Sequence, residues 1–83
     1  MSAFDQVVAI LRDTLQLGAR AENLRPESPL LGGIPEFDSM AVVTLVTMIE
    51  DRLGVTIDDD ELSAEVFATV GSLADFVGRK LDS

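Results

Sequence analysis

Cysteine and histidine are both absent from this 83-residue chain, and their absence excludes a large part of protein chemistry. Without cysteine there is no disulfide and no thiolate, and without histidine there is no imidazole for metal binding or general base catalysis. Any catalysis would depend on carboxylates, hydroxyls and a few cations. The composition therefore argues against an enzyme, and we predict neither catalytic residues nor a metal site.

Basic residues and long apolar runs are also scarce. Six Lys and Arg stand against fifteen Asp and Glu, which gives a net charge of -9. Such a surface repels nucleic acids and anionic membranes and favours partners with basic patches. No apolar run approaches the roughly 20 residues that cross a bilayer, and no signal peptide is visible at the N-terminus. We expect a cytoplasmic monomer that binds neither nucleic acid nor membrane.

The size and the apolar pattern predict one domain, residues 1–83, that is all-α and has an aliphatic core. A first helix is expected from Ser2 to Leu17, with Gly18 as its stop. A short helix should run from the acidic residues 58–61 to about Phe67. Thr69 should cap a last helix, whose buried side is expected to hold Val70, Leu73, Phe76, Val77 and Leu81.

Residues 39–53 require an argument, because their many β-branched side chains favour a strand by propensity. Spacing favours a helix instead: one face collects Val42, Leu45, Val46, Ile49 and Leu53. Strict alternation fails at two points, and the segment exceeds the usual strand length. Gly54 provides a stop. We therefore predict a second long helix.

The region from Gly18 to Asp38 contains three prolines and two adjacent glycines and shows no periodic segment. A loop of this length in a small domain is commonly functional. It ends at Asp38 and Ser39, where the second helix begins. If Asp38 is the N-cap, Ser39 occupies the first helical position with a free hydroxyl. A phosphodiester there would be stabilised by unpaired backbone N–H groups and by the helix dipole.

The outward face of the second helix carries apolar residues edged by acids, which is typical of a docking surface. Its members are Met40, Val43, Thr44, Thr47, Met48, Glu50 and Asp51. Met48 lies at the edge of this face and fits burial equally well.

The residues from Gly32 through Asp38-Ser39-Met40, together with the aliphatic helix and Thr69-Val70-Gly71-Ser72-Leu73, resemble the acyl carrier proteins. The resemblance covers nearly the whole chain. It implies a small four-helix bundle with three longer helices, one short helix and a long first loop. It also implies that a phosphopantetheinyl transferase attaches 4′-phosphopantetheine from coenzyme A to Ser39, with Asp38 supporting recognition.

The same resemblance implies the partners and the cargo. Met40, Val43, Thr44, Thr47, Glu50 and Asp51 would meet acyl-loading, condensing or acyl-transfer enzymes that present basic patches. The acyl group, held as a thioester on the arm, could enter a cleft between the second and third helices. The residues expected to line this cleft are Val43, Val46, Ile57 and Leu62.

One departure from the family pattern concerns the start of the second helix, where members serving fatty acid synthesis usually place acids. Here the positions are Ala41, Val42, Val43 and Thr44. We interpret this as a sign of a specialised lipid, polyketide or secondary pathway. Two alternatives stay open: a peptidyl or aminoacyl carrier, because Leu31-Gly32-Gly33 is similar to the Leu-Gly-Gly motif of such carriers, and an acidic helical interaction module that is never modified.

Overall fold

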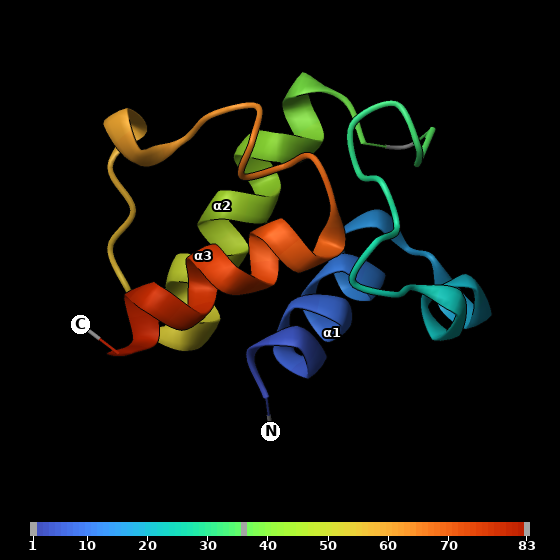
Figure 1. The fold of residues 1–83 in the computed structure, drawn as a ribbon, viewed down its shortest axis with the longest axis horizontal. Helices are drawn as coiled ribbons and strands as arrows, with labels where there is room; N and C mark the ends of the chain where they lie inside the picture. The colour runs from blue at the N-terminus through green and yellow to red at the C-terminus, as the bar shows by residue number, and fades with distance from the viewer. Residues whose placement is uncertain (1, 36, 83) are drawn as a thin grey trace.

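A computed structural model describes residues 2–35 and 37–82. The fold is helical, and these ranges contain no β-strand. Three long α-helices are joined by connections that contain two short 3-10 helices (Figure 1). In chain order, these elements are α1 (Ala3–Leu15), η1 (Gly18–Asn23), α2 (Ser39–Leu53), η2 (Asp59–Glu61) and α3 (Val70–Asp82). The predicted fold class, with three longer helices and one short helix before the last, is confirmed.

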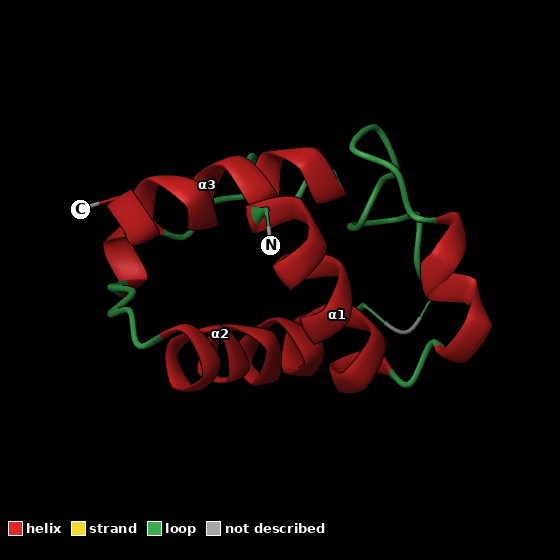
Figure 2. Cartoon of the chain, turned by 90° about the horizontal axis from the view of Figure 1, so that it is seen from below, coloured by secondary structure: helices red, strands yellow, loops and turns green. Residues whose placement is uncertain are grey.

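The core forms around α1, which contacts both α2 and α3 (Figure 2). All three helices and the long loop contribute aliphatic side chains with almost no exposure: Val7, Ile10, Leu11, Leu30, Leu45, Ile49, Val70, Leu73 and Val77. At the edge of this core, the Arg52 guanidinium on α2 lies 2.8 Å from an Asp13 carboxylate oxygen on α1. Except at Leu81, the residues that helical spacing placed on the apolar faces of α2 and α3 are buried or partly buried in this core.

The end of α1 differs slightly from the prediction. The Ser2 hydroxyl accepts a hydrogen bond from the Asp5 N–H at 3.1 Å, as expected of an N-cap. At the other end, Gln16 adopts the left-handed conformation with φ 55°, and its N–H bonds to the Arg12 carbonyl. The helix therefore ends at Leu15 and not at Leu17. Gly18, the expected stop, has φ 58° and begins η1.

The second helix has the predicted bounds, Ser39–Leu53, and ends at Gly54 with φ 66°. Leu45 and Ile49 are buried, and the other expected core residues, Val42, Val46 and Leu53, pack partly buried against them. Helical periodicity thus outweighs β propensity in this segment. Packing of the apolar face compensates for the weak helix preference of the β-branched residues.

The absence of a periodic pattern predicted a long loop without regular structure. The structure differs from this prediction. The loop contains η1, and further on it pairs with the N-terminus of α3 through four backbone hydrogen bonds of 2.7–3.2 Å. In these bonds, the Leu30 and Leu31 N–H groups donate to carbonyls of residues 68 and 67. The Val70 and Gly71 N–H groups donate to carbonyls of residues 28 and 26. The loop thereby supplies acceptors for the free N–H groups at the start of α3.

The connection between α2 and α3 is less helical than predicted. The short helix is confirmed as η2, but it ends at Glu61 and does not continue to Phe67. Beyond it, residues 64–67 form turns, and the carbonyls of Phe67 and Ala68 accept hydrogen bonds from the long loop instead of continuing a helix. Thr69 caps α3 as predicted, with its hydroxyl accepting from the Ser72 N–H at 3.0 Å.

Leu81 is a further correction. It was predicted on the buried side of the last helix but is 39% exposed. Position 78 of α3 lies opposite Ala3, which is the first residue of α1. The final turn of α3 therefore extends beyond the helix that covers the rest of its apolar face.

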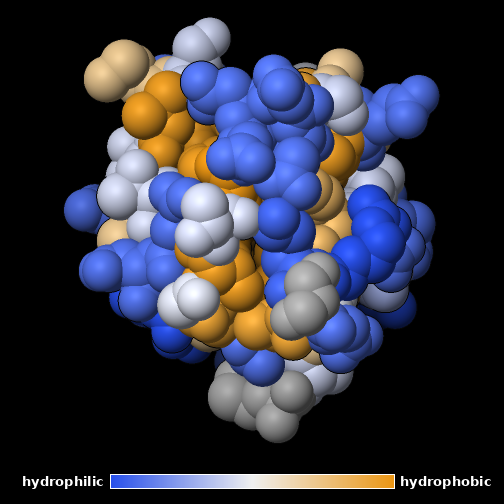
Figure 3. All heavy atoms as spheres, turned by 90° about the vertical axis from the view of Figure 1, so that its left-hand side faces the viewer, coloured by the Kyte–Doolittle hydropathy of each residue, from blue (hydrophilic) through white to orange (hydrophobic). Residues whose placement is uncertain are grey.

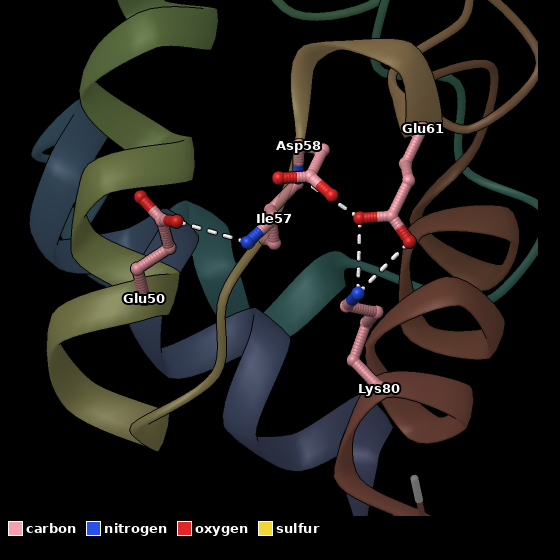
Figure 4. Close-up of polar contacts among 5 residues, drawn as sticks. All are labelled: Glu50, Ile57, Asp58, Glu61 and Lys80. Carbon is pink, nitrogen blue, oxygen red and sulfur yellow. Dashed lines mark hydrogen bonds and ion pairs between the residues drawn. The ribbon is translucent and has the colours of Figure 1, made fainter.

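Two side-chain contacts hold the 54–69 connection against the helices (Figure 4). A Glu50 carboxylate oxygen on α2 accepts a hydrogen bond from the Ile57 N–H at 2.9 Å. On the other side, the Lys80 ammonium on α3 lies 2.8 and 2.9 Å from the two carboxylate oxygens of Glu61. Glu61 also accepts from the Asp58 N–H at 2.9 Å. The connection is thus fastened to both neighbouring helices.

The Glu61–Lys80 contact predicts a pH-dependent stability. Two hydrogen bonds hold the pKa of Glu61 below its ordinary value: the bond from the Lys80 ammonium has the larger effect and the bond from the Asp58 N–H the smaller. A carboxyl group of this kind stabilises the fold above its unfolded pKa and loses that contribution as the pH falls through the folded pKa. We expect Glu61→Gln to lower the melting temperature at neutral pH, with the difference from wild type shrinking as the pH falls through the acid range.

Thermal unfolding followed by circular dichroism across this pH range measures the effect. The exposed Glu65 makes no ion pair with a described residue, so Glu65→Gln is the matched control and should differ little from wild type at either pH. A deficit of Glu61→Gln that stays constant down to acid pH would contradict the assigned role of this ion pair.

Candidate functional site

The site predicted from the sequence lies at the start of α2, where Ser39 is the first helical residue and is exposed. The carboxylate of Asp38 accepts a hydrogen bond from the Ala41 N–H at 2.9 Å, so Asp38 is the N-cap. Among the described residues, the Ser39 hydroxyl has no hydrogen-bond partner. The structure therefore has the predicted arrangement, in which Asp38 caps the helix and the Ser39 hydroxyl stays free.

The same helix start fits a phosphate attached to the serine hydroxyl. The cap uses only the Ala41 N–H, while the Val42 N–H bonds to the Asp38 carbonyl at 3.0 Å. Within the described part of the chain, the N–H groups of Ser39 and Met40 have no acceptor. The first turn of α2 also lacks an acidic residue. Free N–H groups and the positive end of the helix dipole stabilise a phosphodiester at this position.

The predicted docking residues mostly lie on the exposed side of α2. Met40 is 72% exposed and Val43 is 62% exposed, and Thr44 and Thr47 are exposed beside them. Asp51 is exposed further along the helix. The sequence thus placed these five side chains on the correct face.

The other two members of that face are turned toward the protein. Met48 is partly buried and packs against the core, which is the arrangement that its position at the edge of the face equally allowed. Glu50 is partly buried and binds the Ile57 N–H. Its carboxylate therefore also holds the connection in place, a role with no signal in the sequence.

The predicted cargo cleft is not open in this structure. Ile57 is buried, and Val46 and Leu62 pack partly buried against the core, while Val43 points to the opposite, exposed side of α2. An open hollow of about 600 Å³ lies elsewhere, between residues 61–66 and α3. Figure 3 shows this side of the molecule, where apolar surface is visible between hydrophilic side chains. The hollow is lined mainly by polar and charged residues, including Glu61, Asp75 and Lys80.

One contact near the serine was not predicted. The rings of Phe37 and Phe67 lie with their centroids 5.8 Å apart at an interplanar angle of 45°, and both are buried. Phe37 is two residues before Ser39, so this contact ties the chain entering α2 to the connection before α3. The spacing of apolar residues within a segment predicts burial, but it does not predict which distant residue will be the neighbour.

These features define a class of protein. The exposed hydroxyl opens a helix in a small helical fold, and no cluster able to hold a metal ion exists in residues 2–35 and 37–82. None of the described helices is long and apolar enough to cross a membrane. An exposed hydroxyl at a helix start, where free N–H groups and the helix dipole would stabilise a phosphate, is suited to carrying a covalently attached group.

Comparison with known proteins identifies the family. The sequence model of the family described as "Phosphopantetheine attachment site" matches residues 5–77. An acyl carrier protein from Desulforapulum autotrophicum is 32% identical over 80 residues, which cover 96% of this chain and 99% of that protein. The solution NMR structure of a holo acyl carrier protein from Nitrosomonas europaea is 49% identical, covers 100% of both chains and superposes with a TM-score of 0.92.

The chain therefore belongs to the acyl carrier protein family, whose members are carriers and not enzymes. Its covalent cofactor is 4′-phosphopantetheine. The resemblance inferred from the Asp-Ser helix start is confirmed at this level.

Proposed function

We propose that the chain holds an acyl group as a thioester on 4′-phosphopantetheine attached to Ser39 and presents it to partner enzymes. The observation that carries this proposal is the exposed Ser39 hydroxyl, which has no partner among the described residues and stands at the N-terminus of α2. The membership of the chain in the acyl carrier protein family supports the same assignment.

In the loading reaction, the Ser39 hydroxyl oxygen attacks the phosphorus that bears the pantetheine group of coenzyme A. The new serine–phosphate ester bond forms as the pyrophosphate bond breaks, and adenosine 3′,5′-bisphosphate leaves. The hydroxyl proton passes to a base of the phosphopantetheinyl transferase, because this chain contains no histidine and the carboxylate of the adjacent Asp38 caps the helix through the Ala41 N–H. The contribution of the carrier is to expose the nucleophile and to stabilise the resulting phosphodiester at the helix start.

After loading, the arm would deliver its cargo to acyl-loading, condensing or acyl-transfer enzymes in the cytoplasm. The absence of acids from the first turns of α2 supports a specialised lipid, polyketide or secondary pathway. The partner face would consist of Met40, Val43, Thr44, Thr47 and Asp51, with Glu50 at its border. We propose that the carrier acts as a monomer on its own, because Ser39 and this face lie on one helix.

The direct test is the intact mass before and after incubation with coenzyme A, magnesium and a broad-specificity phosphopantetheinyl transferase. We expect the wild-type apo protein to gain one phosphopantetheinyl group and Ser39→Ala to gain none. Ser63 is also exposed but lies on the 54–69 connection, so Ser63→Ala should load like wild type. If the folded, initially unmodified wild type gains nothing, the chain is an interaction module that is never modified.

A further inference from the structure

After the capping Asp38, the exposed face of α2 carries no charge over its first turns, although the chain as a whole is strongly acidic. No Asp, Glu, Lys or Arg occurs from Ser39 to Ile49, whereas the net charge of the chain is -9. The exposed members of this segment form what we call the α2 strip: Ser39, Met40, Val43, Thr44 and Thr47. Met40 and Val43 are the two most exposed large apolar side chains among the described residues.

The threonines of the α2 strip also behave as weakly polar residues. The Thr44 hydroxyl donates to the Met40 carbonyl, and the Thr47 hydroxyl donates to the Val43 carbonyl, each at 3.1 Å. A partner that covers these residues therefore leaves neither donor unsatisfied, which removes the main cost of burying a hydroxyl. An apolar surface can therefore bury the α2 strip without leaving a threonine hydroxyl unsatisfied.

The described acids that flank the α2 strip are few, and two of them each accept a hydrogen bond from a backbone N–H of the same chain. Asp38 accepts from the Ala41 N–H, and Glu50 accepts from the Ile57 N–H, both at 2.9 Å. Asp51 is exposed, but it follows Ser39 by twelve residues, which corresponds to roughly 18 Å along a helix. Among the described acids that flank the α2 strip, a basic cluster of a partner would thus find close to Ser39 the single carboxylate of Asp38, which already caps the helix.

An enzyme that acts on the Ser39 hydroxyl must approach this surface. Val43 follows Ser39 by four residues, so the two side chains lie on the same side of α2, with Cβ atoms about 5–6 Å apart. Met40 is adjacent to the nucleophile. Any active site that closes around Ser39 therefore covers the first turns of the α2 strip, and the chemistry of that strip determines the surface that fits it.

We propose that the enzyme that transfers phosphopantetheine to Ser39 docks on the α2 strip through an apolar surface that buries Met40 and Val43, and not through a cluster of basic residues. The proposal rests on the proposed function, because it concerns the loading of the same serine. Two buried apolar anchors would supply most of the affinity. The acidity of the rest of the chain would act mainly on the rate of encounter.

The test measures kcat/KM for loading of the apo protein by a broad-specificity phosphopantetheinyl transferase, with intact mass as the readout. For wild type, we expect a change of less than about threefold between about 0.05 and about 0.5 M NaCl, whereas a contact dominated by charge would lose roughly tenfold or more. Val43→Asp should lower kcat/KM by about tenfold. Leu81→Asp introduces the same charge at an exposed leucine on α3 and should load like wild type.

Thr44→Glu distinguishes the two kinds of partner by the sign of its effect. A glutamate within the α2 strip should slow loading by an apolar partner and accelerate loading by a basic one. Circular dichroism of each variant verifies that the exposed substitutions leave the fold intact. The proposal is overturned if Thr44→Glu accelerates loading, if salt suppresses wild-type loading tenfold, or if Val43→Asp loads as fast as Leu81→Asp. A wild type that gains no mass contradicts the proposed function itself and overturns both.

Discussion

Gly71→Ala is expected to destabilise the protein strongly, although it adds only one methyl group. Gly71 lies in the first turn of α3, where its N–H donates to the Pro26 carbonyl at 2.7 Å. A Cβ at this position would lie 2.7 Å from the same carbonyl oxygen and 3.1 Å from the Pro26 Cβ. Because the obstacle is backbone, the loop must move away and weaken its pairing with α3.

The expected cost is about 2–4 kcal/mol, which combines overpacking with a weakened hydrogen bond. For a domain of this size, it corresponds to a fall in melting temperature of roughly 10 °C or more. Chemical denaturation followed by circular dichroism measures the free energy of unfolding directly.

Gly78→Ala is the matched control, since it makes the same change in the same helix. Its Cβ would lie 3.6 Å from the Ala3 Cβ, which is an ordinary contact. Alanine is also favoured over glycine in a helix by about 1 kcal/mol. We therefore expect Gly78→Ala to stabilise the protein while Gly71→Ala destabilises it. Equal effects of the two substitutions would contradict the tight approach of Pro26 to α3.

The long helices could be predicted from the sequence because each buries one face over several turns. In residues 39–53 this periodic pattern even outweighed the β-branched composition, and the bounds were correct to the residue. The caps Asp38 and Thr69 were predictable for a related reason: an N-cap bonds to a backbone N–H three residues later, so its partner is local.

The segments between the helices could not be predicted in the same way. η1 and η2 have 6 and 3 residues, too few to show a period. The backbone carbonyls of residues 67 and 68 accept hydrogen bonds from residues 30 and 31 of the distant loop. The ion pair between Glu61 and Lys80 likewise spans 19 positions. Contacts of this kind leave no local pattern in a single sequence.

For the site, too, local features could be predicted from the sequence and contacts between distant residues could not. Ser39 and its exposure followed from the loop–helix boundary, and the outward face followed from the helical wheel. The cargo cleft, in contrast, was implied by the family resemblance and is closed in this structure. Ile57 is buried at 8% exposure, and its N–H is held by Glu50. Whether a cleft between packed segments is open depends on such contacts, which neither composition nor spacing describes.

Leu45→Ala is expected to have the largest effect on stability of any alanine substitution within α2. Leu45 has 0% exposure and packs into the core that α1 shares with α2 and α3. Replacing a fully buried leucine by alanine removes apolar burial and leaves a cavity. Such changes cost about 2.7–5.0 kcal/mol in T4 lysozyme, so we expect about 3 kcal/mol here. A small domain has a total stability of only about 5–15 kcal/mol, so this one change should shift the melting temperature by roughly 15 °C.

Val43→Ala, two residues earlier on the exposed side, provides the comparison. Val43 is 62% exposed, and alanine is a better helix former than valine, so we expect a change within about 0.5 kcal/mol of zero. The contrast tests the helical assignment itself, because residues 43 and 45 would share one face of a strand but lie about 200° apart on a helix. Urea denaturation of the two variants measures both free energies of unfolding. Similar losses at the two positions would contradict a helix that buries Leu45 and exposes Val43.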